Sequence, residues 1–164
     1  NTGGSRFSPS KMADCGNMLQ FQAGTNMVIT HRGKWEVPKE SGNHVGQVAN
    51  WTIKTSAAGG TPMTKAASWI RYGVGIDEAQ ELAQIGTDFA MISARGAWYT
   101  FTTFVENKDN PIIKSWLIDH DVDLTDESIE KAFKFQGMEK VVNFLNDNPE
   151  LMDFLYDEIK EILL

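Results

Sequence analysis

The sequence predicts a mixed α/β protein, of the α+β kind within this chain, with a strand-rich first part and a helical second part. Charge divides near the same place: residues 1–76 carry 8 Lys and Arg against 3 Asp and Glu (+5), and residues 77–164 carry 7 against 19 (−12), which together give −7. The first part alternates apolar and polar residues between turns rich in Gly and Pro, which favours antiparallel strands over a repeating strand–helix order. The second part repeats apolar residues at three- and four-residue steps, which is typical of amphipathic helices.

Composition indicates an ordinary globular protein, with 41% hydrophobic and 23% charged residues in 164. No apolar run approaches the roughly 20 residues that a membrane helix needs, and no signal segment opens the chain. Cys15 is the only cysteine, so an internal disulfide is impossible and a reducing compartment, the cytoplasm, is expected. The chain opens on Asn1 rather than Met, which suggests a piece of a longer protein.

The first part is expected to contain three strands. Residues 1–17 lack periodicity and predict a loop, and residues 19–30 predict a strand. Residues 31–47 contain Pro and a Gly-Asn pair and predict a connection. Residues 48–55 and 65–74 predict the next two strands, separated by a Gly-Gly turn.

The second part begins with a predicted helix. Asp77 is a suitable N-cap, and apolar residues at helical spacing extend this helix toward Arg95 and Gly96. The aromatic and β-branched run Trp98–Phe104 predicts a strand. Residues 112–118 fit either a strand or a helix.

Three further helices are predicted toward the end of the chain. Thr125 is expected to cap a helix that turns Ile129 and Phe133 inward. Residues 138–145 predict a short helix. Asn148 is expected to cap the last helix, with Pro149 at its first position.

The sequence contains no Gly-rich phosphate loop that ends in Lys-Ser or Lys-Thr. The acids of the segment 119–130 have the spacing of a calcium loop, so a calcium-binding module is one alternative. Its sixth position needs a sharp turn but holds Leu124, and Thr125 accounts for the same segment as a helix cap. No metal site is therefore expected.

Aromatic residues and single cations have competing interpretations. The aromatic side chains Trp98, Tyr99, Phe101 and Phe104 could stack nucleic-acid bases, but packing between a sheet and helices is the simpler explanation. Lys54 and Arg71 each fit an exposed, solvated strand face.

Five short stretches follow one another in the order seen in the RecA recombinase family. The stretches are Gly16–Ala23 (GNMLQFQA), Lys39–Gly46 (through Lys39–Glu40, Asn43 and Val45–Gly46), Arg71–Ile76 (RYGVGI), Gly96–Tyr99 (GAWY) and Gln136–Glu150 (QGMEKVVNFLNDNPE). Each is weak alone, but together they span about residues 16–150 and resemble the C-terminal portion of that family. The lengthened segment after Tyr99 is similar to the phage variant, the UvsX-like recombinases.

The resemblance implies that residues 1–76 form the C-terminal part of a RecA-type core sheet and residues 77–164 a small, mostly helical lobe with a small sheet. It implies that residues 1–17 are most of the second loop that binds single-stranded DNA. The DNA-contact candidates in and beside that loop are Arg6, Lys11, Gly16 and Asn17. Lys54 matches the first of two strand-end lysines that reach a neighbour's ATP phosphates across the filament interface.

The chain departs from the family in several places. The phosphate loop, the catalytic Glu and the first DNA loop belong upstream, so this chain has no catalytic residue and is expected not to hydrolyse ATP alone. Ser56 replaces the second strand-end lysine. Lysines that line duplex entry in the family match Ala94 and Met138; the nearby candidates for that role are Arg95, Lys134 and Lys140. The −12 charge of this half argues against strong duplex binding.

The full-length protein is thus expected to be a DNA-dependent ATPase that uses ATP and Mg²⁺. It would form a helical filament on single-stranded DNA and exchange strands with a homologous duplex during recombination and repair, with no membrane partner, in a bacterial or phage-infected cell. The alternative is a stand-alone, non-catalytic interaction module that docks on a recombinase filament.

Overall fold

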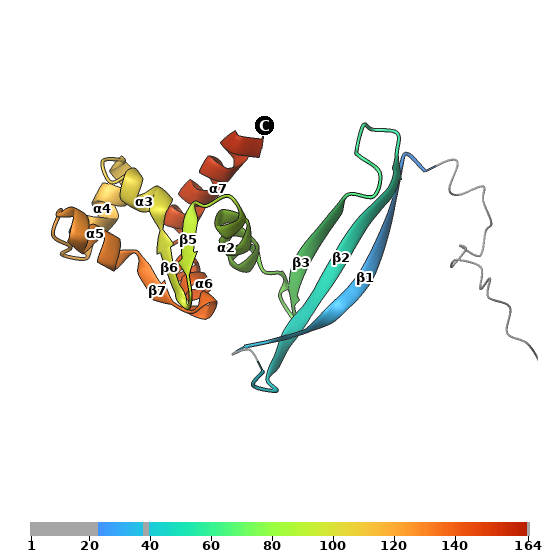
Figure 1. The fold of residues 1–164 in the computed structure, drawn as a ribbon, viewed down its shortest axis with the longest axis horizontal. Helices are drawn as coiled ribbons and strands as arrows, with labels where there is room; N and C mark the ends of the chain where they lie inside the picture. The colour runs from blue at the N-terminus through green and yellow to red at the C-terminus, as the bar shows by residue number, and fades with distance from the viewer. Residues whose placement is uncertain (1–22, 38–39, 164) are drawn as a thin grey trace, which may run out of the picture. The chain divides into compact units, whose positions relative to one another are not determined.

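The computed structural model describes residues 23–37 and 40–163, and the fold is mixed α/β with two antiparallel sheets (Figure 1). The first sheet has the strand order β1-β2-β3-β4, so consecutive strands are neighbours. Its strands are β1 (Thr25–Glu36), β2 (His44–Ser56), β3 (Lys65–Arg71) and β4 (Gly75–Ile76). This confirms the fold class and the antiparallel arrangement expected for the first part. The predicted loop at residues 1–17 lies outside the described residues.

The connection predicted for residues 31–47 is wrong, because β1 runs to Glu36 and β2 begins at His44. The turn between them is short. The Val37 amide donates to the Asn43 carbonyl (3.2 Å), and the Gly42 amide donates to Glu36 Oε2 (3.1 Å). The Gly42–Asn43 pair marks only this turn. The residues that end at Glu36 belong to β1, and their polar composition does not predict a strand.

The described chain divides into two compact units. The first unit takes Val48–Ala67 together with the described part of Asn1–Gly33, and the second takes Lys34–Gln47 with Ser68–Leu164. The predicted domain boundary between residues 76 and 77 stays a prediction. None of the described helices combines the length and the apolar composition needed to cross a membrane.

The step from β3 into the first described helix, α2 (Glu78–Asp88), lies within the second unit. Asp77 caps α2 as predicted, because its Oδ1 accepts the Gln80 amide at 2.9 Å. Its Oδ2 accepts Arg71 Nε at 2.7 Å, and the Arg71 guanidinium carbon lies 4.7 Å from the ring centroid of Trp35. The solvated face predicted for Arg71 is therefore wrong: the side chain is held between a buried carboxylate and an aromatic ring.

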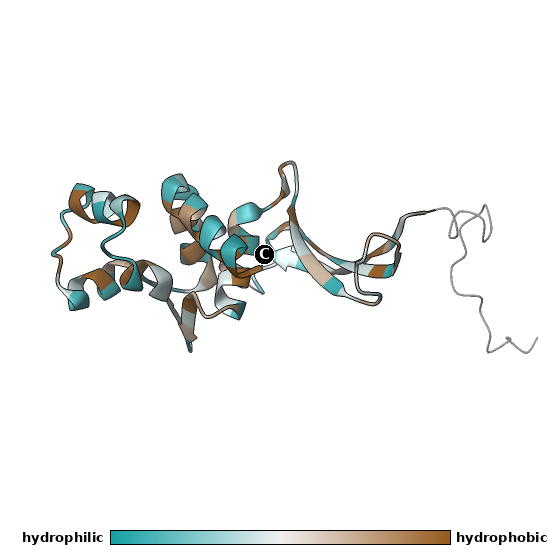
Figure 2. Ribbon diagram, turned by 90° about the horizontal axis from the view of Figure 1, so that it is seen from above, coloured by the Kyte–Doolittle hydropathy of each residue, from teal (hydrophilic) through white to brown (hydrophobic). Residues whose placement is uncertain are grey.

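The second sheet has the order β5-β6-β7, with β5 (Ile92–Arg95), β6 (Trp98–Phe101) and β7 (Lys134–Gln136). The helices that follow β6 are α3 (Thr102–Glu106), α4 (Pro111–Asp119), α5 (Asp126–Ala132), α6 (Met138–Asp147) and α7 (Pro149–Leu163). Figure 2 shows teal and brown bands along these helices, as expected for amphipathic helices. The ambiguous residues 112–118 are helical, because Asn110 Oδ1 accepts the Ile112 amide and Pro111 occupies the first turn.

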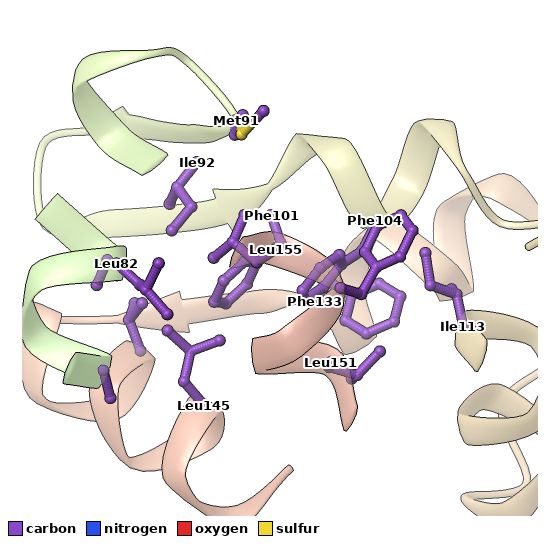
Figure 3. Packing of buried hydrophobic residues seen from close by; sticks show 14 of the residues in the cluster. Leu82, Met91, Ile92, Phe101, Phe104, Ile113, Phe133, Leu145, Leu151 and Leu155 are labelled. Atoms are coloured by element: carbon purple, nitrogen blue, oxygen red, sulfur yellow. The ribbon is translucent and has the colours of Figure 1, made fainter. Parts of the chain in front are cut away.

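The second unit contains one continuous core formed by helices and one face of the small sheet. Phe101 and Phe104 stack at 4.7 Å between ring centroids, and Phe133 meets Phe104 edge-on at 5.3 Å. Figure 3 shows these rings grouped with Leu151 and Leu155 of α7. Ile129 and Phe133 are both fully buried, which confirms the inner face predicted for α5.

Two predicted boundaries are wrong in this unit. α2 ends at Asp88, well before Arg95, because Ile92 enters β5 as a buried strand residue. The Thr102 hydroxyl holds the intervening turn, since it donates to the carbonyls of Ala90 (2.8 Å) and Met91 (2.7 Å). The strand predicted to reach Phe104 ends at Phe101, and Phe104 keeps its place in the core from α3.

Of the predicted N-cap residues Thr125 and Asn148, Thr125 caps its helix and Asn148 does not. Thr125 caps α5 as predicted, accepting the Ser128 amide. Asn148 precedes α7, but its side-chain oxygen accepts Trp116 Nε1 (2.6 Å) and its side-chain amide donates to the Phe144 carbonyl (2.7 Å). The predicted capping role of this side chain is therefore corrected: it connects α4 to the end of α6.

Candidate nucleic-acid interface

One face of the three-stranded sheet points away from the core and carries polar, basic and aromatic side chains. Strand alternation and register place this set together, because Ser93 pairs with Thr100, Arg95 with Trp98, Trp98 with Gln136 and Thr100 with Lys134. We call it the outer sheet face; its residues are Ser93, Arg95, Trp98, Thr100, Lys134 and Gln136. The opposite face contributes Ile92, Phe101 and their neighbours to the core.

The outer sheet face borders an open hollow of about 430 Å³. Its lining consists of Ser93, Arg95, Trp98, Thr100, Thr102, Val105, Glu106, Glu130 and Lys134. Trp98 is 46% exposed, so its ring is accessible from the hollow. Lys134 Nζ lies 5.9 Å from its ring centroid, within reach of a cation–π interaction.

The charges of the hollow are balanced. Arg95 and Lys134 supply two cations, whereas Glu106 and Glu130 supply two carboxylates. Lys134 Nζ lies 4.0 Å from Glu130 Oε1, a loose ion pair one helical turn apart in sequence. An exposed ring beside two cations can stack a base and contact phosphate. The carboxylates oppose phosphate, so such contacts would be weak and strongly dependent on salt.

The structure brings two of the three duplex-contact candidates together. Arg95 at the end of β5 and Lys134 at the start of β7 both line the hollow, although 39 positions separate them (134 − 95). Lys140 lies in α6, is exposed, and is not part of the lining.

The remaining candidates belong to the first part of the chain. Lys54 is exposed in β2, and no side-chain hydrogen bond or ion pair joins it to another described residue. Ser56, which replaces the second strand-end lysine, closes the turn that follows β2: its Oγ accepts the amides of Ala58 and Gly60, both at 3.3 Å. The four loop candidates, Arg6, Lys11, Gly16 and Asn17, lie outside the described residues.

We did not predict from the sequence that Trp98 faces away from the core, on the side of the sheet opposite to Tyr99 and Phe101. Tyr99 and Phe101 point into the core, as the packing interpretation predicts, and Phe104 joins them from α3. Trp98 instead faces outward. Alternation within a strand could have shown this, because a strand that buries Tyr99 and Phe101 must expose Trp98 and Thr100.

The acidic segment 119–130 does not have the geometry of a calcium loop. Within the described part of the chain, no three His, Cys, Asp or Glu side chains are grouped so as to hold a metal ion. Within the segment 119–130 the left-handed backbone falls at Asp121 (φ 52°) and not at Leu124, the position where a calcium loop would need it. Thr125 caps α5 instead.

Comparison with known proteins points to one group of relatives. No protein-family model matches the chain. The chain is 30% identical over 158 residues to Protein RecA of Thermotoga neapolitana, which covers 96% of this chain and 37% of that protein. It is 28% identical over 158 residues to Protein RecA of Thermotoga petrophila, with the same two shares (96% and 37%). It is 28% identical over 121 residues to Protein RecA of Streptococcus sanguinis, which covers 71% of this chain and 31% of that protein.

The chain thus spans about 37% of the length of these two curated Thermotoga relatives. The sequence similarity extends over nearly the whole chain, so it includes both the four-stranded sheet and the helices that follow it. It supports a RecA-family C-terminal portion.

Proposed function

We propose that this chain is the C-terminal portion of a RecA-like DNA recombinase of the phage, UvsX-like variant. In the whole protein it would help to bind single-stranded DNA and to support ATP- and Mg²⁺-dependent strand exchange and repair, in a helical filament in the cytoplasm. The observation that carries this proposal is the similarity to RecA proteins over 96% of the chain. The mixed α/β fold with two antiparallel sheets is the fold class expected for such a portion.

We assign three tasks to the chain within that protein. Residues 1–17 would contact single-stranded DNA through Arg6, Lys11, Gly16 and Asn17. Lys54 would reach a neighbour's ATP phosphates. The outer sheet face would meet duplex DNA weakly through Arg95 and Lys134, with Lys140 as a third candidate.

The loop assignment is tested in a protein that includes the upstream half. Affinity for labelled single-stranded DNA is measured against salt concentration in the parent and in an Arg6→Ala, Lys11→Ala double variant. Each lost phosphate contact on a single strand lowers the slope of log K against log salt by about 0.7, so we expect a slope smaller by about 1.4. Lys65→Ala with Lys160→Ala removes the same charge from exposed positions elsewhere. An unchanged slope in the loop variant would remove these two residues from the DNA site.

The Lys54 assignment is tested through ATP hydrolysis. Lys54→Ala should lower the DNA-stimulated ATPase rate of the whole protein while single-strand affinity without nucleotide stays the same. Lys65→Ala is the matched control, since it removes an exposed lysine from the neighbouring strand β3. Equal ATPase rates in the parent and Lys54→Ala would contradict a contact with ATP. The 164-residue chain alone should show no ATPase activity.

The intact mass of the natural gene product separates the proposal from the docking-module alternative. A product much heavier than 18.3 kDa, by about the size of an ATPase core, supports a recombinase. A product near 18.3 kDa supports a stand-alone module that docks on a recombinase filament.

A further inference from the structure

A second concave surface lies between α2 and α7, which pack against each other in the second unit. It has a volume of about 370 Å³ and is separate from the hollow on the outer sheet face. We call it the acidic groove; its lining residues are Glu78, Glu81, Leu82, Ile85, Met152, Asp153 and Tyr156. None of the tasks proposed above uses it.

The floor of the acidic groove is apolar and continuous with the core. Leu82 belongs to the core cluster, and Ile85 and Met152 pack against that cluster while remaining partly exposed. Tyr156 lies at the groove with 53% of its surface exposed. An apolar side chain from a partner would therefore meet a leucine, an isoleucine, a flexible methionine and an aromatic ring, a set that adapts well to different shapes.

The rim of the acidic groove carries one sign of charge. Glu78 and Glu81 come from α2 and Asp153 comes from α7, and the lining includes no Lys, Arg or His. Phosphate groups of nucleic acids and of anionic lipids would be repelled here, whereas cations would be attracted.

One carboxylate oxygen of the rim lacks a hydrogen-bond donor. Glu81 Oε1 is buried, and no donor among the described residues reaches it. A buried acceptor without a donor costs free energy. Because this oxygen is enclosed by the protein, a lysine or arginine from a partner would pair with the part of Glu81 that lines the groove.

We propose that the acidic groove binds a cationic amphipathic segment of a partner protein. An apolar side chain of that segment enters the floor formed by Leu82, Ile85 and Met152. Its Lys or Arg residues pair with the carboxylates of Glu78, Glu81 and Asp153. Charge complementarity selects this occupant over nucleic acid or an anionic membrane, and the apolar floor selects it over a purely polar cation.

The proposal is tested with the 164-residue chain and a fluorescently labelled Lys/Leu peptide that carries all its leucines on one helical face. We expect saturable binding by fluorescence anisotropy. The same residues in shuffled order, and a lysine-only peptide of equal charge, should bind about tenfold more weakly because they cannot fill the apolar floor. Equal affinity for all three peptides would overturn the proposal.

Charge-removing variants locate the binding site. Glu81→Gln with Asp153→Asn should weaken binding of the amphipathic peptide about tenfold, because both changes keep side-chain shape and remove rim charge. Asp157→Asn with Glu161→Gln is the matched control: it removes two exposed charges from α7 outside the groove. An equal loss in the control would mean unspecific attraction to an acidic helix and would overturn the proposal.

A direct structural readout comes from the methionine methyl groups. In protein labelled with [¹³C]methyl-methionine, the amphipathic peptide should shift the Met152 signal, which Met152→Leu assigns by its disappearance. Met91 lies in the core and is absent from the groove lining, so its signal should stay in place. A peptide that shifts Met91 but not Met152 binds elsewhere, and the proposal fails.

Discussion

Two local constraints meet at the side chain of Asp77. Its two carboxylate oxygens accept from the Gln80 amide and from Arg71 Nε, and the residue is 8% exposed. Helix capping and ion pairing therefore depend on the same buried group. The capping role follows from an Asp before a helical pattern, but the ion pair does not, because it requires the β3–β4 turn to bring Arg71 back to the helix start.

Removing the Arg71 charge should destabilise the second unit. Arg71→Met keeps much of the apolar stem over Trp35 but leaves the Asp77 carboxylate without its partner. Breaking a buried pair costs 3–5 kcal/mol, and the partial exposure of Arg71 reduces this, so we expect a loss of about 2 kcal/mol in the free energy of unfolding. Denaturant titration followed by helical circular dichroism measures it. Lys65→Met is the exposed control, and equal stability of the two variants would contradict the role assigned to this pair.

The exposed pair Lys108 and Asp126 should be visible in a titration. The hydrogen bond and charge of Lys108 hold the pKa of Asp126 below its ordinary value. Because the folded pKa is lowered, the pair stabilises the fold above the unfolded pKa and ceases to do so as pH falls through the folded pKa. Lys108→Met should raise the pKa of Asp126, measured from its side-chain carbon signal by NMR. An Asp126 pKa that is the same in Lys108→Met as in the parent would contradict this pairing.

At the scale of elements, the close approach of β2 and β3 depends on one glycine. A Cβ at Gly46 would lie 2.2 Å from the Ile70 carbonyl oxygen and 2.8 Å from Trp35 Cε3. Neither a strand backbone nor a buried indole can move away cheaply.

Gly46→Ala should therefore force these strands apart, with a loss of about 3 kcal/mol in unfolding free energy or failure to fold. Gly33→Ala is the matched control, because Gly33 also lies in a strand and a Cβ there meets nothing within 4 Å. Thermal unfolding of the two variants makes the comparison. A Gly46→Ala protein as stable as Gly33→Ala would show that the strands can separate without cost.

Helix starts were predictable from the sequence, whereas several element ends were not. Asp77 and Thr125 carry side chains that satisfy backbone amides locally, so their effect is visible in a few residues. The end of α2 depends on Thr102, which binds two carbonyls before β5 from eleven and twelve positions away. Sequence periodicity reports local geometry and cannot show such a distant competitor.

In the candidate interface too, some features follow from nearby residues in the sequence, whereas others depend on strands that pair from distant parts of the chain. Arg95 and Lys134 were identifiable as cations near the right motifs, but only the pairing of β5 and β7 with β6 brings them to one hollow. Trp98 could have been placed outward from strand alternation alone. The role of residues 1–17 in binding single-stranded DNA stays a prediction.

At the scale of the whole molecule, the charge division predicts weak contact between the outer sheet face and duplex DNA. In the protein that includes the upstream half, Arg95→Gln with Lys134→Gln should reduce the salt slope of duplex binding by about 1.8, which corresponds to two phosphate contacts. Electrophoretic or anisotropy titrations at several salt concentrations measure it. Lys114→Gln with Lys131→Gln removes two exposed lysines outside the hollow, and a control slope that falls as far would argue against this face.

Asp77 also has a consequence for how the second unit opens in solution. The Gln80 amide is tied to the same carboxylate as Arg71, and the next amide, Tyr72, donates to the Val45 carbonyl at 3.0 Å. Hydrogen exchange at Gln80 and at Tyr72 should then proceed through one shared opening, with similar protection factors. The last residues of β3 and the first turn of α2 would behave as a single cooperative foldon.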